Sequence, residues 1–129
     1  MEPPPSLHRS AGCHIEQAAG YISVDVGPGL AQEVQECYRA FVHECLQQGC
    51  RHSLIQGTSG WDAFNHLALR DALRAMAQAG LPPGFRLALI ALTPDLIAVY
   101  DAVLVEAGRC GIEARRFLSR ADAEAWLAS

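Results

Sequence analysis

Residues 85–118 constrain the fold more than any other part of the chain. An apolar segment, 87–92, is followed by a helical run and then by a second strand-like segment, 112–118. A strand, a helix and a strand in about this length are the minimum for a crossover between parallel strands. Segment 87–92 contains no polar residue, as expected of a parallel strand that helices cover on both faces. The pattern therefore predicts an α/β fold.

The composition is that of an ordinary globular domain, and it excludes several classes of protein. The 129 residues carry a net charge of −4, and all ten cationic side chains are Arg. This balance argues against a nucleic-acid partner, and a chain without Lys has neither a Schiff-base lysine nor a phosphate-binding P-loop. The chain has no run of about 18 apolar residues, and its N-terminus has no signal-peptide pattern. We therefore expect a cytoplasmic protein that does not span a membrane.

The remaining patterns predict one domain, residues 11–129, after a flexible proline-rich segment, residues 1–10. Two strands joined by a short connection that ends in Gly20 predict an antiparallel hairpin, and the later strands alternate with helices. The predicted order is β-β-α-β-α-β-α-β-α, in a mixed, mostly parallel sheet of four to five strands. The strands are expected at 13–17, 21–26, 51–56, 87–92 and 112–118, and the helices are expected to begin near residues 30, 62, 94 and 120.

Loops that follow parallel strands meet at one edge of such a sheet, where open α/β sheets bind ligands. These loops are expected at 27–30, 57–62, 93–95 and 118–120. Loop 57–62 is the strongest candidate, because its two hydroxyl groups precede a helix whose N-terminus favours anions. The alternative is structural: Ser59 or Asp62 caps the helix, and Trp61 covers the edge of the sheet. The predicted binding residues are Thr58, Ser59, Gly60, Trp61, Asp62 and Thr93.

Neither a metal site nor a cofactor is predicted. Cys37 and Cys45 lie on one helix with about 12 Å of rise between them, which is too far for both to bind one zinc ion. The spacing of Cys45, Cys50 and His52 matches no established zinc pattern. Five cysteines without a C-x-x-C pair favour free thiols over a disulfide framework.

The histidines and carboxylates form no recognisable catalytic set. His14 falls in the hairpin at the edge of the sheet and is expected to be a surface residue. Asp25 is expected to face outward, because it alternates with Val24 and Val26 on a strand. No close pair of carboxylates indicates general acid–base chemistry. The sequence therefore favours a protein that is not an enzyme.

Residues 85–96, 112–119 and 122–127 resemble the C-terminal half of small bacterial proteins related to the STAS domain, the fold of sulphate transporters and anti-sigma-factor antagonists. The resemblance implies a mixed sheet of four or five strands, used as a regulatory or ligand-binding module. In anti-sigma antagonists an Asp-Ser-Ser-Gly motif at the start of the second helix holds the phosphorylated serine. This chain has Gly57-Thr58-Ser59-Gly60 there, which lacks the Asp. The resemblance makes Ser59 and Thr58 the candidates for phosphorylation.

The functional prediction is a non-enzymatic STAS-like module that binds a protein partner or a small anionic ligand at the edge of the sheet. The alternative is a small enzyme or a nucleotide- or phosphate-binding domain that uses the same strand-to-helix loops. A homodimer is a third arrangement compatible with the sequence.

Overall fold

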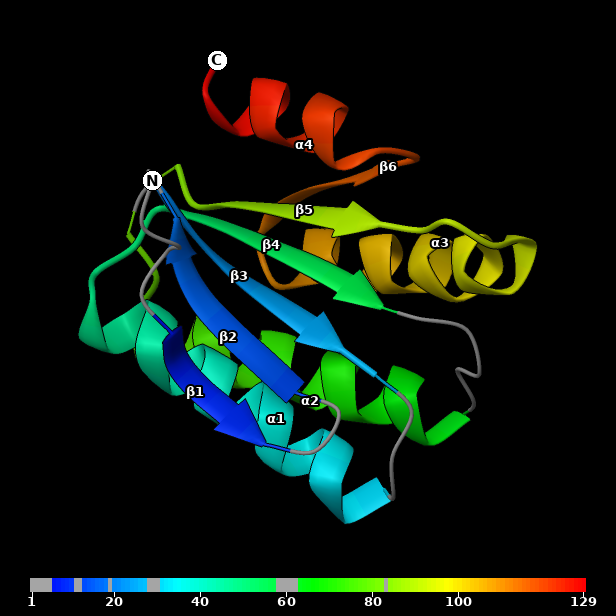
Figure 1. Ribbon diagram of the computed structural model, residues 1–129, viewed down its shortest axis with the longest axis horizontal. Helices are drawn as coiled ribbons and strands as arrows, with labels where there is room; N and C mark the ends of the chain where they lie inside the picture. The colour runs from blue at the N-terminus through cyan, green and yellow to red at the C-terminus, as the bar shows by residue number, and fades with distance from the viewer. Residues whose placement is uncertain (1–5, 11–12, 19, 28–30, 58–62, 83) are drawn as a thin grey trace.

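The computed structural model describes residues 6–10, 13–18, 20–27, 31–57, 63–82 and 84–129 (Figure 1). Within these ranges the chain forms a single sheet with helices on both faces. The elements, in chain order, are β1 (Ser6–Ser10), β2 (Cys13–Ala18), β3 (Tyr21–Val26), α1 (Ala31–Gln47), β4 (His52–Gly57), α2 (Ala63–Ala79), β5 (Arg86–Ile90), α3 (Pro94–Arg109), β6 (Glu113–Phe117) and α4 (Arg120–Leu127).

The strands lie in the sheet in the same order as in the chain, β1-β2-β3-β4-β5-β6. The pairs β1–β2 and β2–β3 are antiparallel, and the three pairs from β3 to β6 are parallel. The α/β class, the mixed and mostly parallel sheet and the predicted order of elements from residue 13 onward are confirmed. The predicted hairpin is confirmed as well, with Ala18 opposite Tyr21 at its closed end and Gly20 at a φ of 86°.

The structure adds one strand to the prediction. The segment 1–10 was expected to be flexible, but Ser6–Ser10 forms β1 and pairs with β2, so the sheet has six strands among the described residues. The sequence of β1, Ser-Leu-His-Arg-Ser, has no clear alternation of apolar and polar residues. Its pairing follows from the open edge of β2 and not from its own pattern, because an unpaired edge offers a row of backbone donors and acceptors.

Alternation along the strands separates two apolar cores. Leu87 and Leu89 point to the face that α1, α2 and α3 cover, where the larger core lies. Ala88 and Ile90 point to the opposite face and pack with Trp126 and other residues of α4. Strand β5 is therefore buried on both faces, as predicted from its apolar sequence. Helix α4 packs mainly on β4, β5 and β6 and reaches β3 through Tyr21, and no other described helix lies over that face (Figure 1).

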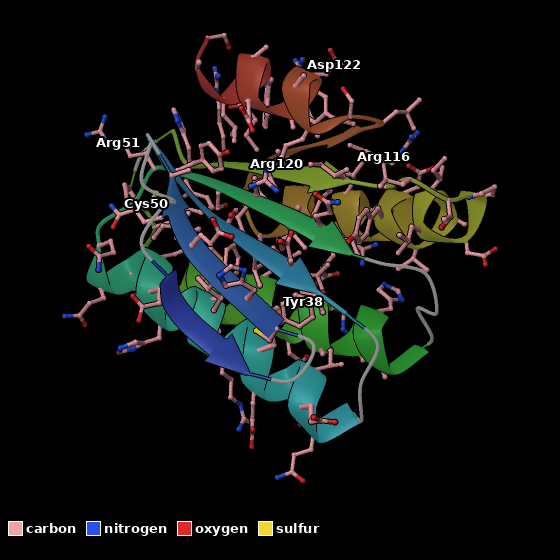
Figure 2. All side chains as sticks on the ribbon, in the orientation of Figure 1. Tyr38, Cys50, Arg51, Arg116, Arg120 and Asp122 are labelled. Carbon is pink, nitrogen blue, oxygen red and sulfur yellow. A yellow bond between two sulfur atoms is a disulfide. The ribbon has the colours of Figure 1, made fainter. Side chains whose placement is uncertain are left out.

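A disulfide bond joins β2 to α1, and this corrects the prediction of free thiols for two of the five cysteines. Cys13 and Cys37 are bonded, with 5.7 Å between their Cα atoms, and both are buried (Figure 2). The prediction was wrong because an odd number of cysteines does not exclude one pair. The bond depends on the packing of α1 against β2, which no spacing in the sequence reveals. Cys45, Cys50 and Cys110 are free.

We expect the Cys13–Cys37 bond to stabilise the fold measurably. Closing a loop across a separation of 24 residues removes chain entropy from the unfolded state, which corresponds to about 3 kcal/mol. Denaturant unfolding of the wild-type protein with and without reductant should show a loss of this size. The double variant Cys13→Ala/Cys37→Ala is the control and should not respond to reductant. Equal stability of the oxidised and fully reduced wild-type protein would contradict the prediction.

Candidate functional site

The predicted binding edge is only partly described by the structure. Thr58, Ser59, Gly60, Trp61 and Asp62 lie outside the described residues. Thr93 lies at the expected edge, immediately before α3, and is the N-cap of that helix. Its Oγ1 accepts a hydrogen bond of 3.4 Å from the backbone N–H of Leu96, and Pro94 occupies the start of the helix as expected.

Among the described residues, Arg120 is a cationic side chain that extends from this edge over the sheet. Ser119 caps α4 by accepting a hydrogen bond of 3.2 Å from the backbone N–H of Asp122, which places Arg120 in the first turn. The guanidinium lies between α4 and the sheet (Figure 2). Its Nη1 donates to Gln56 Oε1 over 3.4 Å, and the same atom is 3.9 Å from Asp25 Oδ1. One side chain therefore connects α4 with the ends of β3 and β4.

Glu124 completes this polar group one turn further along α4. Its Oε1 accepts hydrogen bonds from Arg120 Nε at 3.2 Å and from the Tyr21 hydroxyl at 3.0 Å. Partial burial raises the pKa of Tyr21, so the hydroxyl keeps its proton and acts as a donor near neutral pH. Two donors on one carboxylate oxygen hold Arg120 and α4 in a defined position above β3.

Asp25 has an unusual environment for a carboxylate on a strand. Its Oδ1 is shielded from solvent and has no hydrogen-bond partner among the described residues. Partial desolvation raises the pKa of Asp25, and the Arg120 guanidinium opposes this shift. A carboxylate oxygen that is shielded from water without a donor is costly, although the Asp25 side chain as a whole is 48% exposed.

Asp25 also lies beside two groups of β2. His14 is directly opposite Asp25 in the antiparallel register, and Glu16 is two residues further along the same face of β2. His14 Nδ1 lies 3.1 Å from Glu16 Oε1. One donor atom from each of the three side chains lies within 4.8 Å of the others, which is the spacing of a group able to hold a metal ion. The polar face therefore contains two adjacent groups, one around Arg120 and one around His14.

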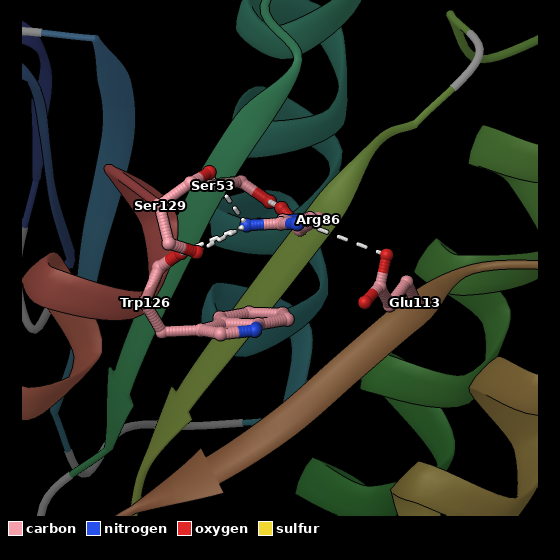
Figure 3. Close-up of polar contacts among 5 residues, drawn as sticks. All are labelled: Ser53, Arg86, Glu113, Trp126 and Ser129. Carbon is pink, nitrogen blue, oxygen red and sulfur yellow. Dashed lines mark hydrogen bonds and ion pairs between the residues drawn. The ribbon is translucent and has the colours of Figure 1, made fainter.

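A separate set of contacts holds the C-terminal end of α4 on the sheet (Figure 3). Arg86 Nη1 donates to the carbonyl oxygen of Trp126 at 2.8 Å and to Oγ of Ser129 at 2.9 Å. The guanidinium carbon lies 5.2 Å from the centre of the Trp126 ring, within cation–π range, and Arg115 lies 5.4 Å from the same centre. Nε of Arg86 is 3.7 Å from Glu113 Oε2. These contacts fix the helix that carries Arg120.

The buried carboxylate of α3 has a structural explanation. Glu106 accepts a hydrogen bond of 2.8 Å from Arg74 Nε, and Arg109 Nη1 lies 3.8 Å from its other oxygen. The bond from Arg74 holds the pKa of Glu106 below its usual value. This ion pair connects α2 with α3 and involves none of the polar groups around Arg120.

The cysteines and histidines that were considered as metal ligands are explained by other contacts. Cys37 is in the disulfide bond, Cys45 is buried, and Cys50 Sγ donates to the carbonyl oxygen of His52 over 2.7 Å. His43 is exposed on α1.

Sequence reasoning did not find that His14, Glu16 and Asp25 converge. It had placed His14 in the hairpin and turned Asp25 outward, and both placements are confirmed. The signal that would have found the group is the register, because a hairpin with Ala18 opposite Tyr21 places residue 14 opposite residue 25.

Comparisons with known protein families, with curated proteins and with solved structures find no match to this chain.

We expect Arg86→Met to lower the free energy of unfolding by about 1–3 kcal/mol, because it removes the charge-assisted hydrogen bonds that join β5 to the end of α4. Chemical denaturation measures the loss. Arg115→Met is the matched control, since Arg115 lies over the same Trp126 ring but is exposed, and its effect should be below about 0.5 kcal/mol. Equal losses in both variants would contradict this role of Arg86.

Proposed function

We propose that this protein is a non-enzymatic, STAS-like regulatory module that binds a protein partner at the edge where the parallel strands end. The supporting observation is a pair of exposed leucines at this edge. Leu92 follows β5 and is 58% exposed, and Leu118 follows β6 and is 62% exposed. Large apolar side chains that stay in water at a binding edge are typical anchors of an interface.

The sheet register places the two leucines at the same edge of the sheet. Ile90 and Phe117 are the last paired residues of β5 and β6, so Leu118 is one residue beyond the ladder and Leu92 is two residues beyond it. The N-cap Thr93 lies next to Leu92, and Arg120 lies two residues after Leu118. Apolar anchors with a polar rim are the usual composition of a protein interface.

The regulatory part of the proposal rests on the resemblance to anti-sigma antagonists. Gly57 ends β4 at the same edge, and Thr58 and Ser59 follow it in the chain. We propose these two hydroxyls as phosphorylation sites. A phosphate next to an apolar interface adds negative charge and bound water to that interface. Phosphorylation would therefore change the affinity for the partner.

We also propose a cytoplasmic location. None of the described helices has an apolar stretch long enough to cross a bilayer. Disulfide bonds such as Cys13–Cys37 are more frequent in oxidising compartments. Fractionation of the source cell therefore tests the proposed location directly.

Replacing both leucines should release the partner. We expect Leu92→Ser/Leu118→Ser, used as bait in extract of the source cell, to recover the partner at least about fivefold less than wild type, because truncation of an interface anchor costs more than about 1 kcal/mol. Quantitative mass spectrometry of the bound proteins gives the ratio. Val105→Ser is the matched control, since Val105 is 59% exposed but lies near the C-terminal end of α3, away from this edge.

Identical sets of bound proteins on all three baits would contradict the proposed edge. The same extract supplied with ATP addresses the switch, and a chain that carries no phosphate on Thr58 or Ser59 after incubation would contradict it. Light scattering over a range of concentrations separates a partner protein from a second copy of this chain.

A small anionic ligand is the second candidate, and Arg120 is the observation that favours it. In that case inorganic phosphate should raise the melting temperature of the wild-type protein, and Arg120→Gln should abolish the shift by removing the cation of this edge. Arg116→Gln is the control, because Arg116 forms its ion pair with Asp101 at 2.9 Å, on the side of the sheet covered by α3. No shift in the wild-type protein would exclude inorganic phosphate as the ligand.

A further inference from the structure

We propose that His14, Glu16 and Asp25 form a binding site for a divalent first-row transition-metal ion on the open face of β2 and β3. The site goes beyond the proposed function and does not depend on it, because its ligands come from the hairpin and not from the loops at the carboxyl ends of the strands.

The backbone places the three ligands on one face of the hairpin. His14 and Glu16 are two residues apart on β2, so their side chains point the same way. Asp25 is the cross-strand partner of His14, and directly opposite residues of an antiparallel pair have Cβ atoms about 4.5–5.5 Å apart. A two-stranded ladder is a stiff support, so the ligands need no loop movement to converge.

The side chains already have nearly the spacing that a metal ion requires. Metal–nitrogen and metal–oxygen bonds of about 2.0–2.2 Å place two ligand atoms of one ion about 3–3.5 Å apart. His14 Nδ1 and Glu16 Oε1 are 3.1 Å apart, within this range. All three donor atoms lie within 4.8 Å of one another. A change in the side-chain torsion angles that moves the Asp25 carboxylate by about 1 Å would bring the three donor atoms to the spacing that one ion requires.

The surroundings of one Asp25 oxygen favour a bound cation. Its Oδ1 is shielded from water and receives no hydrogen bond within the described part of the chain. The guanidinium of Arg120 is 3.9 Å away, beyond hydrogen-bond distance, and donates instead to Gln56 and Glu124. A bound cation would satisfy the oxygen that the protein leaves without a donor.

The donor set indicates the class of ion. One imidazole nitrogen and two carboxylate oxygens suit ions such as Mn²⁺, Fe²⁺ and Zn²⁺, and no thiolate contributes a preference for softer ions. The two carboxylates balance the charge of a divalent ion, and Glu124 balances the nearby Arg120. His14 and Glu16 are about one quarter exposed, which leaves the remaining coordination positions of the ion open to water.

Mn²⁺ is the sharpest probe, because it is a hard ion that the free thiols of Cys45, Cys50 and Cys110 bind poorly, and because it is paramagnetic. We expect the full-length protein, treated with chelator and titrated with MnCl₂, to bind one ion per chain. The NMR signals of β2 and β3 around His14, Glu16 and Asp25 should broaden first. The ion that remains free is counted by electron paramagnetic resonance.

Asp25→Asn and His14→Gln should each bind Mn²⁺ at least tenfold more weakly, while their amide spectra show that the fold is retained. Asp71→Asn is the matched control, because Asp71 is an exposed carboxylate of α2 on the other side of the sheet, and it should bind as the wild type does. Absence of binding at millimolar Mn²⁺, broadening centred on another part of the chain, or wild-type affinity in folded Asp25→Asn would each overturn the site.

Discussion

The direction in which the chain adds strands determines the character of the two faces of this sheet. From β3 to β6 each crossover moves one strand further in the same direction, and its helix returns over the same face. Three helices therefore pack on one face. The other face receives α4, which comes after the last strand, packs mainly on β4, β5 and β6, and contacts β3 through Tyr21 and Asp25. The unequal covering leaves room for polar chemistry on β2 and β3.

The polar character of that open region results from the alternation of side chains along each strand. In β3, Ile22, Val24 and Val26 are buried in the larger core, while Asp25 points to the other face. The polar side chains of this region are more than a solvent-exposed strand face, because Glu124 and Arg120 of α4 add further charges beside them. The face is thus built from two parts of the chain far apart in sequence, the first hairpin and the last helix.

Local chemistry made most of the fold predictable, and distant pairing limited the rest. The hairpin, the starts of the helices near residues 94 and 120 and the doubly buried β5 depend on neighbouring residues, and all were anticipated. The partner of Cys13 lies on α1, and the pairing of β1 depends on the edge of β2, so neither has a local signature. The convergence of the hairpin with Arg120 required the position of α4, which its short sequence does not specify. The loop after β4, which carried most of the predicted site, lies outside the described residues.

Strand β6 ends the sheet, and its composition bears on how two molecules can meet. Its sequence, Glu-Ala-Arg-Arg-Phe, carries three charges in five residues. Glu113, Arg115 and Arg116 engage Arg86, the Trp126 ring and Asp101 within the same chain. A second strand added along β6 would have to lie among these charged groups and remove them in part from water, which protects the edge against open-ended sheet extension. This border of the molecule is therefore suited to keep neighbouring copies apart in concentrated solution.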